Sequence, residues 1–506
     1  MARPDEPTAE QREARIAELR ARRRARLGML ARRSAFIAVG LVLLLVVGLV
    51  WLLQTIAGRD VLLNPIVSRL PADATLTWAS AEGPAAGPLT LHDVHFSLPR
   101  QLDPDCVPSP DATCQMGRVV FDAELVVLDP AIRPLLGRRL RLDALVVRDA
   151  SLALPRSDTP FELPQWPESL PGIAPPLALQ ADDIRIDDLV VHQDGAPLIA
   201  IASARGGMDA SDGRLHVEHL VVESDRGRFT AHGDYAPHDD YRSDLTLSAL
   251  LPAPTGRTAP RIGMVVRGDL SRMLVAVSGH APAPVDALLV LSDDSGGEDP
   301  RWSLRATSEA LDPGLLIGSG EASEPLSFDF KAGGVGGGAR LQGEFARGDF
   351  SATIQPSRLR LEDQVLEFKP LVVDLLDGRL VARGHVDLRR DALNRAGDES
   401  PIRLALQARN LRWTGSTPEV PAIVLDADVG VAGTPELWAA IGNATFQRGD
   451  QQATVRFDSL GNRAGAEVRK LHAATSNGAL DATGKVEWSP ALAWNGDATL
   501  TGFDPG

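Results

Sequence analysis

The sequence predicts a mainly β protein in which one N-terminal transmembrane helix precedes an elongated, twisted array of amphipathic hairpins. A charge-free run of 25 residues, 34–58, predicts the helix. Beyond it, short segments that alternate apolar and polar residues are separated by Gly, Pro, Asp and Asn, which is typical of strands and turns. Related segments also recur along the chain. With 506 residues, the chain is too long for a single compact core.

The apolar run has the length and flanking charge of an uncleaved membrane anchor. Phe36–Leu53 contains fourteen Leu, Ile, Val or Phe residues, which favours membrane insertion by roughly 4–8 kcal/mol. A cleaved signal peptide has a shorter apolar core, of about 7–15 residues. Residues 1–33 carry a formal charge of +5 and the remainder −20. By the positive-inside rule, the Arg-rich leader 1–33 is cytoplasmic and residues 59–506 lie on the other side of the membrane.

Composition and motifs argue against an enzyme, a cofactor or a nucleic-acid partner. The net charge of −15 disfavours binding to a nucleic-acid duplex, because neutralising its phosphates needs clustered Lys and Arg. The glycine-rich segment Gly333–Gly338 lacks the Lys-Ser/Thr of a phosphate loop and is expected to connect strands. His216 and His219 are interpreted as too isolated for a metal site. Two carboxylates facing across a cleft are the one catalytic arrangement that the sequence leaves open.

The two cysteines predict a local disulfide. Cys106 and Cys114 enclose seven residues in a loop rich in Pro and Asp. On the non-cytoplasmic side of the membrane, an isolated pair of this kind is most simply a disulfide. The alternative, a zinc site, would need His92 and His95 as further ligands. Because those two residues are three apart in an alternating segment, we expect them on opposite faces of a strand.

The alternation assigns one apolar and one polar face to each predicted strand. In Ile402–Arg409 the apolar side chains occupy every second position, and Arg and Gln alternate with them. Applied along the chain, this pattern predicts an apolar lining. The predicted lining residues are Ile184, Ile186, Leu215, Val217, Phe229, Ala231, Leu245, Leu247, Leu380, Ala382, Ile402, Leu404, Leu406, Leu480 and Ala482.

Two internal echoes indicate that one structural unit is repeated with drift. Gly227–Gly233, Gly378–Gly384 and Gly478–Gly484 share the pattern G-x-Φ-x-A-x-G, where Φ is an apolar residue. Trp302–Gly314 and Trp494–Gly506 are identical at six of thirteen positions, including the first Trp and a final Asp-Pro-Gly. The spacing between units is irregular, so we expect an array of hairpins rather than a solenoid of fixed period.

Hairpins with one apolar face must bury that face against another sheet, a lipid or a partner. A sheet folded along its length into a trough would place the apolar face inside. The leading hypothesis is therefore a conduit that holds acyl chains. The alternatives are a scaffold that pairs client β-strands with its exposed edge, and a surface adhesin, for which eight scattered Trp residues are few.

The Arg-rich leader, the single anchor and the drifting hairpins resemble the TamB family of the AsmA-like superfamily, which are inner-membrane subunits of the translocation and assembly module. Leu76–Pro99, LTWASAEGPAAGPLTLHDVHFSLP, resembles the family's first segment after the anchor. The resemblance covers essentially the whole chain, but it rests on patterns of residue type and on no catalytic signature. The chain stops at Asp504-Pro505-Gly506, which corresponds to the middle of a repeat. Nothing matches the family's C-terminal domain, so we expect a truncated chain.

The resemblance implies a long β-taco, an open β-groove that crosses the periplasm of a Gram-negative bacterium. It implies transport of phospholipid through contacts with its acyl chains, and support for the assembly and secretion of autotransporters and other outer-membrane proteins. The implied partner is a TamA-like outer-membrane protein of the BamA class, which would bind the missing C-terminal region. The implied location is the inner membrane, with a cytoplasmic N-terminus and a periplasmic bulk.

Overall fold

The structure is a computed structural model of the chain. It describes residues 43–44, 47–48, 51, 54–56, 59, 73–84, 87–102, 114, 116–131, 139–155, 178–211, 213–293, 300–316, 323–388, 401–413, 421–489 and 491–502.

The predicted leader and most of the predicted anchor lie outside the described residues. Those described between Leu43 and Arg59 are largely helical, with Thr55 donating its backbone N–H to the Trp51 carbonyl. No helix in the described part of the chain is long and apolar enough to cross a membrane. The anchor itself therefore stays a prediction.

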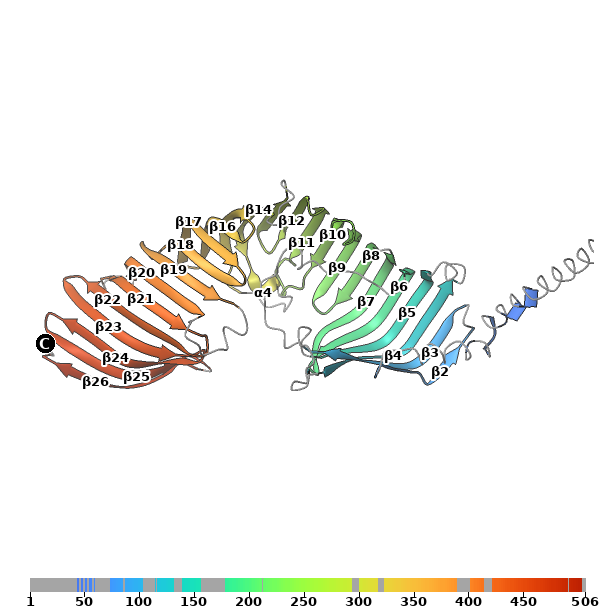
Figure 1. Ribbon diagram of the computed structural model, residues 1–506, viewed down its shortest axis with the longest axis horizontal. Coiled ribbons are helices and arrows are strands. Elements are labelled where there is room, and N and C mark those ends of the chain that lie inside the picture. The colour runs from blue at the N-terminus through green and yellow to red at the C-terminus, as the bar shows by residue number, and fades with distance from the viewer. Residues whose placement is uncertain are drawn as a thin grey trace, which may run out of the picture.

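The described residues form a mainly β fold, a single large sheet of 26 strands. Figure 1 shows how the strands follow one another along the molecule. The first strands are β1 Thr75–Thr77, β2 Ser80–Glu82, β3 Leu89–Gln101, β4 Met116–Ala131, β5 Arg139–Leu154, β6 Ala178–Gln193, β7 Ala196–Ser211, β8 Arg214–Ser224 and β9 Gly227–Ala236. The middle strands are β10 Arg242–Leu250, β11 Arg261–Gly268, β12 Arg272–His280, β13 Pro284–Ser292, β14 Arg301–Leu311, β15 Leu326–Val335, β16 Gly338–Arg347 and β17 Phe350–Glu362, with the short helix α4 Pro313–Leu316. The last strands are β18 Val365–Leu375, β19 Gly378–Asp387, β20 Ile402–Trp413, β21 Ile423–Gly433, β22 Trp438–Arg448, β23 Gln451–Gly461, β24 Gly465–Thr475, β25 Gly478–Glu487 and β26 Ala493–Thr501.

The order of strands in the sheet follows the order in the sequence, with one irregularity. From β6 to β26 each strand pairs antiparallel with the next, as predicted for successive hairpins. β5 and β6 instead pair parallel, which a series of hairpins does not predict. The short strands β1 and β2 both pair with β3 and form one edge of the sheet, whereas β26 forms the other. The sheet is therefore open, with its two edges at opposite ends.

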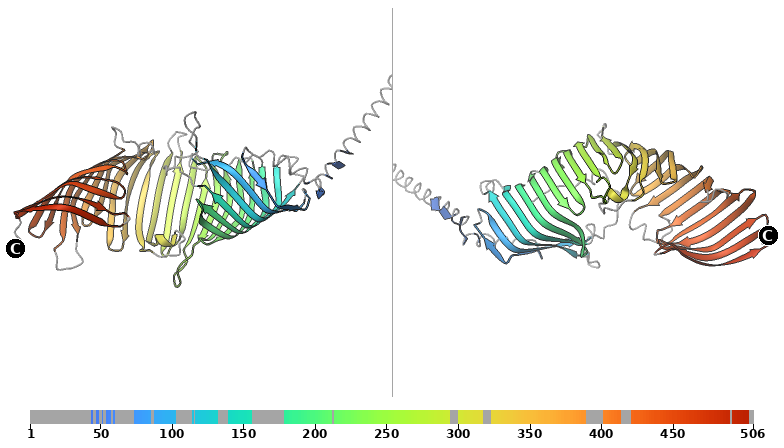
Figure 2. Two further views of the ribbon diagram at one scale, coloured as in Figure 1. Left: turned by 90° about the horizontal axis from the view of Figure 1, so that it is seen from below. Right: turned by 180° about the vertical axis from the view of Figure 1, so that it is seen from behind.

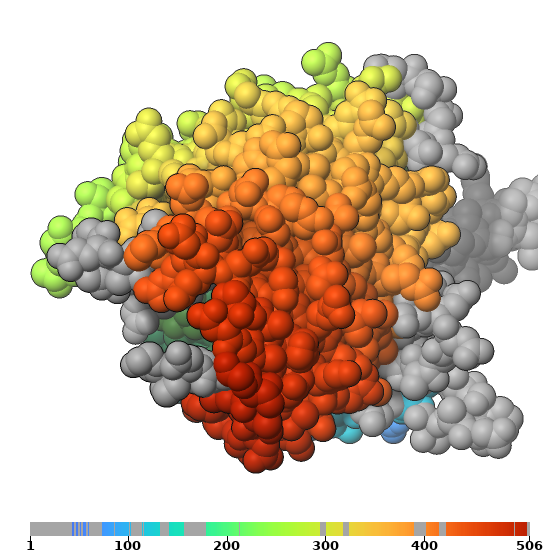
Figure 3. Space-filling view, turned by 90° about the vertical axis from the view of Figure 1, so that its left-hand side faces the viewer, coloured from blue at the N-terminus to red at the C-terminus, as the bar shows by residue number. Residues whose placement is uncertain are grey.

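The sheet is elongated and arched. Figures 1 and 2 show the strands stacked along the long axis of the molecule, with β3 near one end and β26 at the other. At about 4.8 Å between neighbouring strands, the step from β3 to β26 covers roughly 110 Å along the sheet. Figure 3 looks along this axis from the C-terminal end, where β26 faces the viewer.

β-bulges keep the apolar side chains of a strand on one face. Along β20, side-chain exposure alternates from Ile402 to Arg409, and the register then shifts between Ala408 and Leu411. The extra residue is Asn410, whose φ is 55°. Asp and Asn adopt this left-handed conformation more readily than most residues. The bulge therefore inserts one residue and returns Leu411 to the face that Ala408 occupies.

The glycines that close the G-x-Φ-x-A-x-G segments sit where no side chain fits. Gly233 and Gly384 have φ of 131° and 130°. A Cβ atom at Gly233 would lie 1.9 Å from the Asp244 carbonyl oxygen, and one at Gly384 would lie 2.0 Å from the Arg403 carbonyl oxygen. Each glycine thus permits a close approach of the next strand.

A small buried cluster lies beside the middle of the sheet, around α4. Asp312 and Leu315 are both 0% exposed. The Asp312 carboxylate accepts hydrogen bonds from the backbone N–H and hydroxyl of Ser323 (2.9 Å each), and it lies 3.5 Å from a guanidinium nitrogen of Arg257. Burial raises the pKa of Asp312, but the hydrogen bonds from Ser323, Leu315 and Gly314 outweigh it, so the pKa lies below its ordinary value. The ionised carboxylate therefore joins the loop after β14 to Arg257, in the loop between β10 and β11.

We predict that Asp312→Asn destabilises this cluster by about 1–3 kcal/mol, the usual cost of losing hydrogen bonds to a charged group. Because the folded pKa is depressed, the contribution is present at neutral pH and is lost as the pH falls below about 4. Urea unfolding at pH 7 and at pH 3 measures the effect. The exposed, Arg267-paired Asp244→Asn is the control, with an expected loss of at most about 1 kcal/mol. Equal losses for Asp312→Asn at both pH values would contradict the prediction.

Candidate functional site: the apolar face

Side chains in register across neighbouring strands form one apolar row along the sheet, here called the central ladder. It takes one residue from every strand from β3 to β26, and each is Ala, Val, Leu, Ile, Met, Phe or Gly. In strand order these residues are Leu89, Leu128, Leu145, Ile184, Gly206, Leu220, Ala231, Leu247, Met264, Val277, Ala287, Ala306, Phe330, Gly343, Ile354, Val373, Leu380, Ala408, Ala427, Ala444, Val455, Ala473, Leu480 and Leu500.

The ladder remains continuous through the bulge between β7 and β8. A Cβ atom on Gly206 would lie 2.7 Å from the Leu220 Cα, so these two residues face each other. His219, with φ of 45°, is the extra residue that returns Leu220 to the face of Val217. The face of the sheet that carries the central ladder is here called the apolar face.

All fifteen sequence-predicted lining residues lie on the apolar face. Five are on the central ladder itself, and the others lie on flanking rows that run in register beside it. For example, Ala382 pairs with Leu406, and Leu471 with Ala482. The central-ladder members are Ile184, Ala231, Leu247, Leu380 and Leu480. The flanking members are Ile186, Leu215, Val217, Phe229, Leu245, Ala382, Ile402, Leu404, Leu406 and Ala482.

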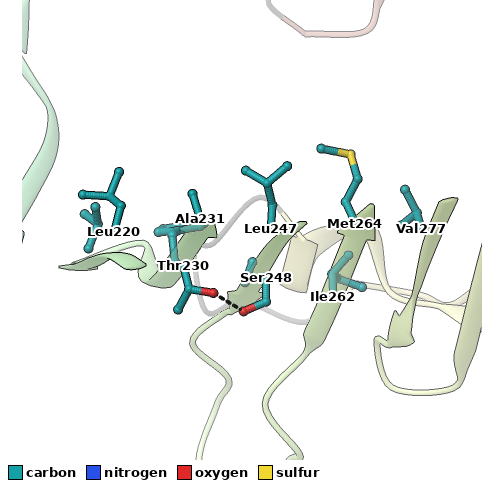
Figure 4. Close-up of a pocket in the computed structure, with 11 residues that line it drawn as sticks. Leu220, Thr230, Ala231, Leu247, Ser248, Ile262, Met264 and Val277 are labelled. Atoms are coloured by element: carbon teal, nitrogen blue, oxygen red, sulfur yellow. Dashed lines mark hydrogen bonds between the residues drawn. The ribbon is translucent and has the colours of Figure 1, made fainter. Parts of the chain in front are cut away.

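The apolar face is hollowed over β8–β12. A depression of about 280 Å³ is lined by the side chains of these strands. In Figure 4, Ala231, Leu247 and Met264 point to one side of the sheet, whereas Thr230 and Ser248 point to the other and bond to each other at 2.7 Å. The lining side chains are only half-buried, so their apolar surface is available to a ligand.

Serines within the buried rows of this face do not offer free polar groups. Ser308 donates its hydroxyl to the Pro284 carbonyl, Ser357 to Gln355, and Ser459 to Ala440. A hydroxyl that already donates to a backbone carbonyl gains little by bonding to a lipid headgroup instead. The apolar face is therefore suited to an apolar ligand, and it offers no polar group that would select a particular headgroup.

The opposite face of the sheet is polar and carries cross-strand ion pairs. Arg409 bonds to Asp428 at 2.7 Å, Arg469 to Asp458 at 2.6 Å, and Arg379 to Asp374 at 2.7 Å. The hydrogen bond from Arg379 lowers the pKa of Asp374, which keeps that carboxylate charged. Exposed ion pairs of this kind add little to the stability of the fold. Their charges favour exposure of this face to water over its burial.

The structure corrects two expectations about histidines. His216 and His219 are not isolated, because His232 on β9 lies beside them, with ring centroids 6.1 Å and 4.8 Å away. His92 and His95 do not lie on opposite faces. Asp93 between them has a left-handed φ of 51°, and Leu91 and Val94 are both buried in the same apolar cluster, so the two histidines beside them lie on the other, polar face. Alternation counted through a left-handed residue gives the wrong face. Even so, the described residues include no group that could hold a metal ion.

Cys114 is disulfide-bonded, whereas Cys106 lies outside the described residues. Their pairing therefore stays a prediction. Peptide mapping without reductant is expected to recover one fragment that joins Cys106 to Cys114. Two separate free-thiol peptides, from protein isolated from an oxidising compartment, would contradict it.

Comparison of the chain with protein-family models, with curated proteins and with solved structures finds no match. The functional interpretation therefore depends on the geometry of the apolar face.

Proposed function

We propose that this protein is a non-enzymatic conduit that holds phospholipid acyl chains along its apolar face and carries them away from a membrane to which its N-terminal segment anchors it. The observation that supports the proposal is the central ladder, which is apolar in every strand from β3 to β26. In this proposal the sheet acts as a β-taco whose apolar interior is the lipid path.

The energetics suit movement better than tight binding. Each buried methylene contributes about 0.8 kcal/mol, so acyl chains bind without any polar contact. Neighbouring residues of the central ladder are chemically alike. An acyl chain that moves by one strand therefore exchanges one set of contacts for an equivalent set. The phosphate headgroup would remain in water at the open side of the sheet.

The proposed location is the bacterial inner membrane, with the sheet in the periplasm. The charge-free run at 34–58 and the Arg-rich leader support this topology. A reporter enzyme fused after residue 60 tests it: activity only on the periplasmic side is expected, and activity in the cytoplasm would contradict it. Delivery toward the outer membrane, a TamA-like partner there and a role in outer-membrane protein assembly are proposed from the resemblance alone.

Lipid that copurifies with the chain tests the binding step. Residues 59–506, secreted to the periplasm and purified without detergent, are expected to carry phospholipid that mass spectrometry identifies after extraction. A secreted control protein purified in the same way sets the background. Lipid at the background level would refute the proposal.

A further inference from the structure

Four basic side chains on the polar face face each other across the strands without an acidic partner. They lie on the consecutive strands β14–β17 and are here called the basic cluster: Arg305, Lys331, Arg340 and Arg358. Arg305 lies directly opposite Lys331, and Arg340 directly opposite Arg358. All four side chains are exposed, and none of them forms an ion pair with another residue in the described part of the chain.

This arrangement differs from the ion pairs found elsewhere on the polar face. Arg267, for example, lies directly opposite Asp244 and is bonded to it at 3.0 Å. Asp329 and Glu344 lie in the row beside the basic cluster, but the described residues include no ion pair between these acids and the cluster. Like charges directly opposite each other on neighbouring strands are destabilising. The four cations therefore repel one another unless an anion from outside the sheet lies among them.

An apolar patch adjoins the basic cluster on the same face. It consists of the aliphatic side chains on β11–β13 that point away from the apolar face: Val265, Leu274, Ala276, Leu288 and Val290. Leu288 is 41% exposed, and the other four side chains are half-buried. Leu288 also lies directly opposite Arg305 of the basic cluster. The patch and the cluster therefore form one continuous surface, here called the amphipathic strip, along the long axis of the sheet.

The dimensions and charge of the amphipathic strip indicate the class of its occupant. At about 4.8 Å per strand, the basic cluster extends over roughly 14 Å and the whole strip over roughly 29 Å. Several carboxylates spaced along a polypeptide match this length better than one small anion does. An anionic membrane surface is disfavoured, because residues 34–506 carry a net charge of −20 and would be repelled by it.

We propose that the amphipathic strip binds a segment of a partner polypeptide that carries aliphatic residues at one end and several Asp or Glu residues at the other. The carboxylates of this segment lie among the four cations and remove their repulsion. Arginine, which provides three of the four cations, suits carboxylates because it donates two parallel N–H bonds. The aliphatic residues of the segment cover the apolar patch. This inference does not depend on lipid transport, because the strip lies on the face opposite the central ladder.

A fluorescent synthetic peptide in which first Leu and then Glu alternates with Ser is the probe. We expect saturable binding to the full chain, measured by anisotropy, and weaker binding at high ionic strength. Arg340→Glu combined with Arg358→Glu is expected to weaken binding by about tenfold or more. A second peptide, with Lys in place of Glu, should bind this double variant and not the unmodified chain, which shows that the variant is folded.

Arg403→Glu is the matched control and should leave binding of the Glu peptide unchanged. Arg403 is also exposed on the polar face and has no ion pair with a described residue, but it belongs to β20, outside the strip. Leu288→Ser should weaken binding without changing its dependence on salt. The absence of binding, or equal binding to the double variant and the unmodified chain, would overturn the proposal.

Two further results would assign the basic cluster to another occupant and also overturn the proposal. One is binding of phosphatidylglycerol vesicles that the double variant loses, with no binding of the Glu peptide. The other is a rise of about tenfold in affinity for the Glu peptide when Asp294→Asn, Glu298→Gln and Asp299→Asn are combined. These acids precede β14 in the sequence, and such a rise would show that the chain's own carboxylates compete for the cluster.

Discussion

Leu247→Asp is expected to interrupt the proposed lipid path at β10 and to reduce lipid adducts beyond it at least tenfold. Leu247 is a rung of the central ladder, between Ala231 and Met264, and it lines the depression on the apolar face. An unpaired carboxylate in an apolar path costs several kcal/mol, and 1.4 kcal/mol already corresponds to tenfold. Aspartate is the chosen replacement because its side chain is too short to place its charge in water beyond the rim, as Arg or Lys would.

The measurement uses photoreactive residues on either side of the substitution, at Leu145 and at Leu480, with lipid supplied from the membrane at the N-terminal end. Adducts at Leu145 should remain, and those at Leu480 should be lost. Thr246→Asp, one residue away on the polar face, is the matched control and should preserve both. Unchanged adducts at Leu480 in a folded Leu247→Asp variant would show that lipid does not follow the central ladder.

The second large effect concerns the glycines that close the repeated segments. Gly384→Val is expected to destabilise the sheet around β19 and β20 by about 3 kcal/mol or more, because φ near +130° is accessible essentially to glycine alone. In addition, the new Cβ atom would lie 2.0 Å from the Arg403 carbonyl oxygen. The lower urea midpoint and faster amide exchange in β19 and β20 measure the loss.

Gly430→Ala in the neighbouring strand β21 is the matched control. The nearest atom to a Cβ there is the Ile441 Cγ1 at 3.9 Å, and its φ is not in the left-handed region. A Gly→Ala change without strain is expected to stabilise by about 0.4–1 kcal/mol, through the unfolded chain. If Gly384→Val and Gly430→Ala had the same effect, the close approach at Gly384 would not be a constraint on the fold.

The sequence was sufficient for the apolar face because period-two alternation is a property of the single strand. Ile402–Arg409 assigns its own faces, and the register then aligns Leu380, Ala408 and Ala427 into one row. Bulges are harder to predict, since the extra residue at His219 or Asn410 is an ordinary polar residue whose conformation depends on the partner strand. The expected placement of His92 and His95 on opposite faces was wrong for a related reason, since Asp93 between them also takes a left-handed conformation.

Features that depend on contacts between distant segments were also not predictable. The buried Asp312 bonds to Ser323 and approaches Arg257, and no local pattern relates these three residues. The parallel pairing of β5 with β6 depends on a long connection between them, outside the described residues. The segment Trp302–Gly314, by contrast, was recognisable in the sequence from its similarity to Trp494–Gly506. Only the structure shows that Trp302 lies opposite Gly334 of β15.

The central claim is that lipid contacts one face of the sheet, and paired photocrosslinking tests it most directly. Photoreactive residues at Leu245 and Leu480 lie on the apolar face, and those at their neighbours Thr246 and Asp481 lie on the polar face. In cells, lipid adducts are expected at Leu245 and Leu480 and at least tenfold fewer at Thr246 and Asp481. Equal adducts at all four positions, or none at Leu245 and Leu480, would contradict the proposal that the apolar face carries lipid.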